Sequence, residues 1–379
     1  MINKDTNTPF HPPGAGYLSA PFVFLFSLMD SQDADRLNPT GSYAYLGFFA
    51  ASLFYFLTGM NLISKVAEKK KYNLSKLILF TGFIGTISHF VTTRFMMAHA
   101  TEFFLCAMLC YKFETKENEY NWRNFSCLSF IYLLLSFTRP STFIYSLCLL
   151  VVYSNSKDFK IKKLSLVFIN SSIFLFLHIL LSNYLYSEPT IFHNLRITQE
   201  QQGFTDVSLQ YIFLNSSKLF ELFFSPSMGA MWVMPIIFFG IVSLIFNVKF
   251  KNNLLQTLFL FLYFYGAFVV LIVWQGREVA YGQRLLIGLI PFCMIKLAKY
   301  DTPQIFNKIL GFFTTISYLG YLYFYSSSNL TLKPGITLWG SKVGYAGEDY
   351  FLRLPFEIFS VENIVDILGK TIYSVNYFH

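Results

Sequence analysis

The chain has 379 residues, of which 54% are hydrophobic and 20% aromatic, whereas only 13% are charged. A soluble globular chain carries about 25% charged residues, so this chain has too little charge to cover its apolar side chains in water. The composition excludes a soluble enzyme, a disordered chain and a small disulfide-stapled secreted protein. It predicts an all-α, polytopic integral membrane protein.

The formal net charge of +8 is the usual sign of a nucleic-acid binder. In a membrane protein, however, Lys and Arg gather in the cytoplasmic loops. We therefore expect membrane lipids and no nucleic acid among the partners. The five cysteines all fall inside apolar stretches. Although Cys106 and Cys110 share one helix face, no His or Cys cluster completes a metal site around them, and we interpret them as small buried hydrophobes.

The N-terminal segment, 1–42, contains one apolar stretch at residues 17–30. At 1.5 Å per residue this stretch covers about 21 Å, less than the roughly 30 Å of a bilayer core. It is either a short membrane span or a helix that lies in the outer interface. The second interpretation makes 1–42 an outer segment with an interfacial helix.

The following apolar stretches predict about ten transmembrane helices, or eleven if 17–30 also spans the membrane. They lie at 43–64, 77–93, 97–112, 125–138, 140–153, 164–187, 229–247, 254–274, 285–298 and 309–326. Together they define a membrane domain at 43–326, which is followed by an outer C-terminal tail at 327–379.

The connections between these stretches alternate in charge. Five of them hold 17 of the 29 Lys and Arg residues, at 65–76, 112–124, 154–163, 247–253 and 296–308. By the positive-inside rule these five are cytoplasmic. The opposite connections, including a long outer loop at 188–228, then face the outside of a bacterial inner membrane. A single kinked helix at 125–153 would invert this topology downstream, and we favour the hairpin of two short helices.

Polar residues that could carry chemistry gather on the predicted outer side. RFMMAHATEFF contains Arg94, His99 and Glu102, and the i, i+3 spacing places His99 and Glu102 within reach of each other. FTRPSTF places Arg139 between two short helices. Each group has a structural interpretation, an ion pair that orients helices or a side chain that reaches the headgroups. The functional interpretation is a recessed polar site, because polar groups at membrane depth are costly.

The segment WQGREVAYGQRLLIGLIP carries Arg277, Glu278, Tyr281 and Arg284 next to a predicted membrane helix. Arginine donates two parallel hydrogen bonds to a phosphate, so this segment is either an anion site or a structural loop. No cofactor is identified from the sequence. His89, His99 and His193 are too scattered to predict a metal site, although a divalent cation remains possible.

Six segments, taken together, resemble the bacterial C-type integral-membrane glycosyltransferases. These enzymes are relatives of the protein O-mannosyltransferases and of the lipid A aminoarabinose transferase. The matches occur in the order of the family and cover roughly residues 10–300. They are HPPGAGYLSAPF at 11–22, NPTGSYAY at 38–45, MMAHATEFF at 96–104, FTRP at 137–140, LFFSPSMGAMWVMP and GREVAYGQRLLIGLIP.

The resemblance implies a transferase that takes a sugar from a polyprenyl-phosphate donor on the outer face of the inner membrane. The acceptor would be a lipid, a glycan or a protein. A carboxylate would act as the general base, and arginines with a tyrosine would stabilise the departing phosphate. The implied donor-phosphate ligands are Arg277, Tyr281, Arg284 and Arg139, with Arg94, His99 and Glu278 in support.

The chain departs from the family pattern at its N-terminus. Members of the family begin with a membrane helix and an outer loop that bears the catalytic acidic residues, and the PPG-like motif follows that loop. Here the motif stands at residues 12–14. We therefore expect an upstream helix and acidic loop, an inactive truncated copy, or a substitute carboxylate. The substitutes are Glu102, Asp30, Asp33 and Asp35, of which Glu102 and Asp35 are our catalytic candidates.

Three other functions remain open. An O-antigen polymerase or ligase also has ten or more spans, but it usually has larger outer loops than 188–228. A flippase or transporter for lipid-linked sugars is expected to have inverted repeats, broken helices and polar residues near the midplane. In this sequence the charges gather at one face instead. A non-catalytic fragment is the third alternative.

Overall fold

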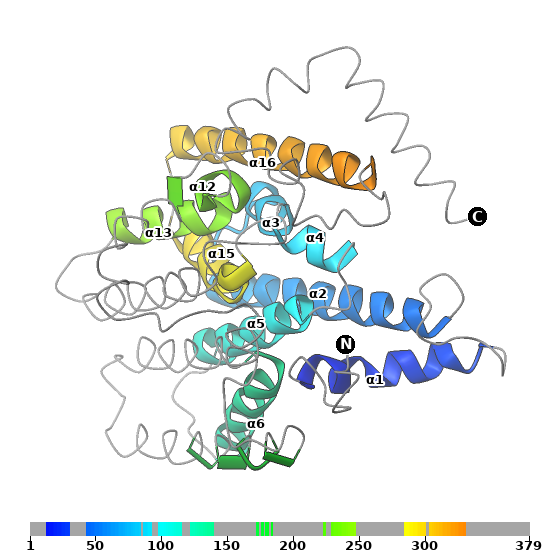
Figure 1. Cartoon of the computed structure of the whole chain (residues 1–379). Helices are drawn as coiled ribbons and strands as arrows, with labels where there is room; N and C mark the ends of the chain where they lie inside the picture. Colours follow the sequence, from blue (N-terminus) through cyan, green and yellow to red (C-terminus); the bar gives the residue numbers. More distant parts are fainter. Residues whose placement is uncertain are drawn as a thin grey trace, which may run out of the picture.

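The computed structural model describes eight longer stretches, at residues 13–30, 43–84, 86–92, 98–115, 122–139, 229–247, 284–300 and 303–330. It also describes the short pieces 172–173, 176–177, 179–181, 183–184 and 223–224. Within these residues all regular structure is helical and no strand is present. The described part of the chain is therefore all-α, as the composition predicts (Figure 1).

Helices α1 (Gly14–Ser27) and α2 (Tyr43–Lys70) form an antiparallel pair. Asp30 accepts hydrogen bonds from the first two backbone N–H groups of α2, those of Tyr43 and Ala44. A carboxylate at this position satisfies N–H groups that have no partner within the helix and favours the positive end of the helix dipole. Asp30, one of the possible substitute carboxylates, therefore caps α2.

The two helices pack closely along their length (Figure 1). A Cβ added at Gly47 of α2 would lie 2.6 Å from the Cα of Val23 in α1, so glycine is required for this approach. Further along, the Tyr55 hydroxyl donates to the carbonyl of Leu18 at 2.7 Å. These contacts fix α1 against the first half of α2.

The end of α2 is defined by a Schellman-type turn. Lys71 has a φ of 57°, and the N–H groups of Lys71 and Tyr72 donate to the carbonyls of Glu68 and Ala67. The chain then enters α3 (Lys76–Phe83), where the Ser75 side chain accepts from the backbone N–H of Ile78. Ile84 is extended, and a separate helix, α4 (Thr86–Thr92), follows.

Helix α5 (His99–Thr115) runs parallel to α2. A Cβ added at Gly59 of α2 would meet the ring of Phe103 and the backbone of Phe104, and the Lys69 ammonium donates to the carbonyl of Thr115. Helix α6 (Trp122–Thr138) returns to the start of α5 and packs on it. Their contact is a small core formed by Leu105, Cys106, Leu109, Ile131, Tyr132 and Leu135.

Helix α15 (Ile290–Lys299) is the centre of the main core. Every residue from Ile290 to Ala298 is buried, which is the pattern of a helix surrounded by protein on all sides. It contacts α2, α3, α5 and α13 (Pro235–Asn247). A short 3-10 helix, η3 (Arg284–Leu289), leads into α15, and α12 (Ala230–Val233) leads into α13.

Helix α16 (Gln304–Leu330) lies along the outside of this core (Figure 1). It runs parallel to α3 and α4, because Thr81 contacts Thr314 at 2.9 Å and Thr92 contacts Tyr321 at 3.2 Å. The Ser317 hydroxyl also donates to the carbonyl of Val233 in α12. Hydroxyl contacts, those of Thr314 and Ser317 buried and that of Tyr321 exposed, thus hold α16 in register with its neighbours.

The helices follow the predicted apolar stretches closely, but three stretches are divided. The predicted span 77–93 forms α3 and α4, the stretch 229–247 is divided at Met234, before Pro235, and the stretch 285–298 is shared by η3 and α15. The predicted spans 140–153 and 254–274 and the tail beyond Leu330 lie outside the described residues, as do most of the span 164–187 and all of the loop 188–228 except 223–224.

One helix among the described residues, α2, is long and apolar enough to cross a membrane, and α1 is a shorter apolar helix. The larger number of spans, about ten, stays a prediction. The structure does place three of the Lys-rich connections together. The backbone N–H of Asn73 donates to Ala298, and Lys69 reaches Thr115, so the described parts of 65–76, 112–124 and 296–308 meet at one end of the helices.

Replacing Gly47 with alanine tests the close packing of α1 on α2. The new methyl group would collide with the backbone of Val23, and we expect a loss of stability of about 1–3 kcal/mol. Gly16→Ala is the matched control, because nothing lies within 4 Å of its added Cβ and alanine favours a helix by about 0.5–1 kcal/mol. Thermal unfolding of both purified variants should therefore shift in opposite directions, and equal shifts would contradict the packing.

Candidate functional site

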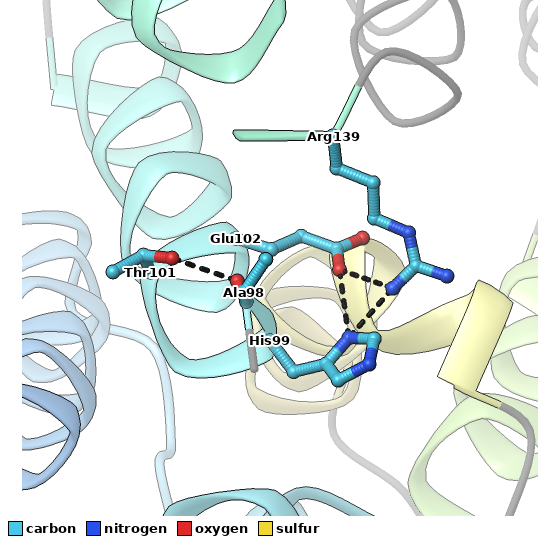
Figure 2. A network of polar contacts seen from close by, with 5 residues as sticks. All are labelled: Ala98, His99, Thr101, Glu102 and Arg139. Carbon is cyan, nitrogen blue, oxygen red and sulfur yellow. Dashed lines mark hydrogen bonds and ion pairs between the residues drawn. The ribbon is translucent and has the colours of Figure 1, made fainter. Parts of the chain in front are cut away.

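Glu102, His99 and Arg139 form a buried polar cluster (Figure 2). The Arg139 Nη1 atom lies 2.8 Å from Glu102 Oε2 and 2.6 Å from His99 Nδ1. His99 Nδ1 lies 3.2 Å from the same Glu102 oxygen. The Glu102 side chain is fully buried, and that of Arg139 is 14% exposed. An arginine and a carboxylate are therefore paired where water has little access.

Two helix ends bring these side chains together. His99 and Glu102 lie in the first turn of α5, where a carboxylate favours the positive end of the helix dipole. Arg139 follows directly after α6, and its N–H donates to the carbonyl of Leu135 at 2.7 Å. Because α6 packs on α5 through their shared apolar core, Arg139 is directed at the start of α5.

Arg139 is the hydrogen-bond donor of this cluster. Arginine can only donate, so the 2.6 Å contact requires His99 Nδ1 to accept a hydrogen from Nη1. In this arrangement Nδ1 and Glu102 Oε2 both accept from Arg139. The cluster is thus one guanidinium edge that is held by two acceptors.

Segments from other parts of the sequence surround this cluster. The ring centroids of Phe90 and His99 are 3.9 Å apart. A Cβ added at Gly14 would lie 2.4 Å from the carbonyl carbon of Phe137, so the N-terminus of α1 rests on the end of α6. Helix η3 packs against α4 and α5. The buried hydroxyl of Thr138, the residue before Arg139, has no hydrogen-bond partner among the described residues.

The cluster of Glu102, His99 and Arg139 lies about midway along the length of α2. Gly59 of α2 is level with Phe103, the residue after Glu102. At 1.5 Å per residue, Glu102 is therefore about 22 Å along α2 from Tyr43 and about 16 Å from Lys69. The paired charges are near the middle of the helical layer rather than at its surface.

The structure brings together three of the residues selected from the sequence, His99, Glu102 and Arg139. The spacing predicted that His99 and Glu102 lie within reach of each other, and their contact confirms it. Arg284 is the first residue of η3, and only its backbone is described. The remaining candidates, Asp35, Arg94, Arg277, Glu278 and Tyr281, lie outside the described residues.

A second buried ion pair joins Lys296 to Glu114, with 3.5 Å between Nζ and Oε1. Their side chains are 4% and 10% exposed. The Tyr72 hydroxyl donates to the other carboxylate oxygen at 3.4 Å. Burial, and then the negative charge of Glu114, raises the pKa of Tyr72 to about 12. The same two causes raise the pKa of Tyr300, so these phenols stay protonated at neutral pH.

The sequence reasoning missed this second pair because it assigned both residues to solvated cytoplasmic connections. Lys296 and Glu114 are also far apart in the chain, so no local spacing joins them. One signal was present, since Lys296 lies within the apolar run IPFCMIKLAK. A lysine inside such a run needs a buried partner.

The described residues contain no group of three or more His, Cys, Asp or Glu side chains that could hold a metal ion. No protein-family model, curated protein or solved structure matches this chain. Its function must therefore be argued from the residues and their geometry.

Replacing Arg139 with methionine tests the buried pair. Glu102 would lose its cation in a buried environment, and we expect a loss of about 3–5 kcal/mol in the free energy of unfolding. The double variant Arg139→Met/Glu102→Leu should recover most of this loss, because it removes the stranded carboxylate as well. Unfolding of the purified proteins checks this, with Lys299→Met, an exposed lysine, as the control. Wild-type stability of Arg139→Met would contradict the pairing.

Proposed function

We propose that the protein is an integral-membrane glycosyltransferase that uses a polyprenyl-phosphate sugar, with Arg139 among the ligands of the donor phosphate. One observation carries the proposal. The described parts of segments with a resemblance to C-type glycosyltransferases, PGAG, HATEFF and FTR, lie around the Arg139–Glu102 contact. The described part of a fourth segment, GREVAYGQRLLIGLIP, begins at Arg284 and packs against α5.

The proposed reaction breaks the bond between the anomeric carbon of the sugar and the donor phosphate oxygen. The bonding electrons leave with the polyprenyl phosphate, and an acceptor hydroxyl oxygen forms the new bond to the anomeric carbon. A general base takes the proton of that hydroxyl. Arg139 stabilises the negative charge that develops on the leaving phosphate, because a guanidinium fixed in place before the reaction needs no reorganisation.

The burial of Glu102 bears on which carboxylate acts as the base. Its side chain is fully buried and its Oε2 accepts from Arg139, which favours an anchoring role over removal of an acceptor proton. Asp35 is then the remaining candidate base. It belongs to the segment between Asp30 and Tyr43, whose two ends are joined by the cap on α2.

Exposed apolar side chains support the membrane location of the proposed enzyme. On α1, Phe24 and Leu25 are 64% and 61% exposed, and on α16, Ile305 and Phe312 are 68% and 61% exposed. Large apolar patches on monomeric soluble proteins are rare and mark interaction or membrane surfaces. Lipid tails would cover these side chains.

A transporter for lipid-linked sugars is the second candidate. Two observations favour it, the broken helices at Ile84 and Met234 and an ion pair near the middle of the helical layer. Both features are expected of alternating-access transporters. The two candidates share a lipid-phosphate ligand and differ in whether the sugar is transferred or translocated. Covalent transfer to an acceptor in detergent, where no membrane barrier exists, distinguishes them.

Labelling of introduced cysteines tests the proposed topology. Tyr43→Cys lies at the proposed outer end of α2, and Lys76→Cys lies at the Lys-rich end; both native side chains are exposed. We expect a membrane-impermeant maleimide to label Tyr43→Cys in intact spheroplasts and Lys76→Cys only in inverted vesicles. The unmodified parent protein is the background control. Labelling of both positions from the same side would contradict the topology.

Loss of the arginines tests the proposed reaction. We expect Arg277→Ala and Arg284→Ala each to reduce sugar transfer from a polyprenyl-phosphate donor by at least about 100-fold, as for the removal of a donor that stabilises a transition-state anion. The amount of protein inserted in the membrane should stay unchanged. Lys299→Met, at the opposite end of the helices, is the control. Full transfer by both arginine variants would contradict the assignment.

A further inference from the structure

Two exposed lysines stand near the starts of neighbouring helices, where the helix itself does not favour a cation. Lys76 is the first residue of α3, and Lys308 lies in the second turn of α16. The N-terminus of a helix is the positive end of its dipole. Neither helix has an acidic residue in its first turn. Both lysines therefore add to a positive potential that the two helix starts already create.

Other lysines at this end of the bundle are explained by the helix ends that they occupy. Helices α2, α5 and α15 finish here, and a cation in the last turn favours the negative end of a helix dipole. The lysines in these last turns are Lys69, Lys70, Lys112, Lys296 and Lys299. Lys76 and Lys308 have no such explanation, because their helices begin at this end. An anion outside the protein would offset their charge.

The two lysines lie at nearly the same level of the parallel helices α3 and α16, which pack side by side (Figure 1). Thr81 contacts Thr314 at 2.9 Å, and both helices rise 1.5 Å per residue. Residue 76 is therefore level with residue 309, one position from Lys308. Since packed helices are about 8–10 Å apart, the two flexible side chains can reach one phosphate group.

An apolar surface continues from the two lysines along the seam between α3 and α16. Phe80, one turn after Lys76, is 47% exposed, and its ring is in T-shaped contact with that of Tyr318. Between these rings and the lysines, a Cβ built on Gly311 meets only Leu77 Cδ1, at an ordinary 3.9 Å. Packing within the protein thus does not require glycine here, although glycine is unfavourable inside a helix. The missing side chain leaves room on this surface for an acyl chain.

We propose that Lys76 and Lys308 bind the headgroup of an anionic phospholipid, whose acyl chain lies along Phe80, Gly311 and Tyr318. These five residues form the α3–α16 lipid site. Phosphatidylglycerol fits it, because its phosphodiester carries one uncompensated negative charge. Phosphatidylethanolamine fits less well, because its own ammonium group repels the lysines. The inference goes beyond sugar transfer and depends only on the proposed membrane location of the chain.

Native mass spectrometry of the purified full-length protein in detergent tests the headgroup contact. Dioleoyl phosphatidylglycerol and dioleoyl phosphatidylethanolamine are titrated separately, and the ratio of their first dissociation constants measures the preference. We expect wild type to prefer phosphatidylglycerol. The variant Lys76→Gln/Lys308→Gln should reduce this preference at least about tenfold, because each lysine at a lipid surface contributes about fivefold.

Two matched variants separate a defined site from an effect of net charge or of the proposed donor site. Lys65→Gln/Lys71→Gln removes the same charge from exposed positions at the same end of the helices, and it should keep the wild-type preference. An equal loss in both lysine variants would overturn the proposal. The variant Arg139→Met/Glu102→Leu should also keep the preference. Its loss there would overturn the proposal as well, because the lipid would then occupy the donor site.

Replacing Gly311 with leucine tests the position of the acyl chain. The new side chain should weaken binding of phosphatidylglycerol about fourfold, which corresponds to the burial of one methylene group. The midpoint of thermal unfolding should not fall, because leucine favours a helix more than glycine does. Wild-type affinity of this variant would overturn the proposal. So would a wild-type dimer in the same spectra that Gly311→Leu dissociates, because the seam would then be an interface between two copies.

Discussion

Helix α5 carries two buried carboxylates, and the arrangement of its neighbours depends on them. Glu102 and Glu114 are twelve residues apart on this helix, about 18 Å. A buried carboxylate without a cation is strongly unfavourable. Arg139 reaches the first from the end of α6, and Lys296 reaches the second from α15. In the view of Figure 1, α6 and α15 lie on opposite sides of α5. Each charge therefore determines which helix can pack beside it.

The two pairs have different surroundings, which suggests different uses. The Lys296–Glu114 pair is completed by the phenol of Tyr72, whose raised pKa keeps its proton available to the carboxylate. That arrangement satisfies the charges and joins the Lys-rich connections. The Arg139–Glu102 pair includes the imidazole of His99, whose Nδ1 lies 2.6 Å from Arg139 Nη1. It also adjoins a buried hydroxyl, that of Thr138, with no partner in the described part of the chain. The groups around the Arg139–Glu102 pair are therefore the ones suited to bind a ligand.

Much of the helical arrangement was predictable from the sequence. Apolar stretches located the described helices because a helix buried in protein or lipid needs a continuous run of apolar residues. The contact between His99 and Glu102 followed from their spacing of three residues on one helix. The pairing of Lys296 with Glu114 was not predictable in this way, because it joins distant segments and depends on the burial of α15. The role of Asp30 was also missed, since a helix cap usually stands directly before its helix.

The central position of α15 has a consequence for how the protein assembles. This helix lies about three quarters of the way along the chain, yet it completes the packing of α2, α3 and α5. During synthesis those earlier helices emerge long before residue 290. Glu114 can therefore pair with Lys296 only after the later segment has been made. Contacts of such large sequence separation form slowly, and unfinished surfaces are exposed in the meantime. The core around α2, α3 and α5 is thus completed only when a helix from much later in the chain has been made.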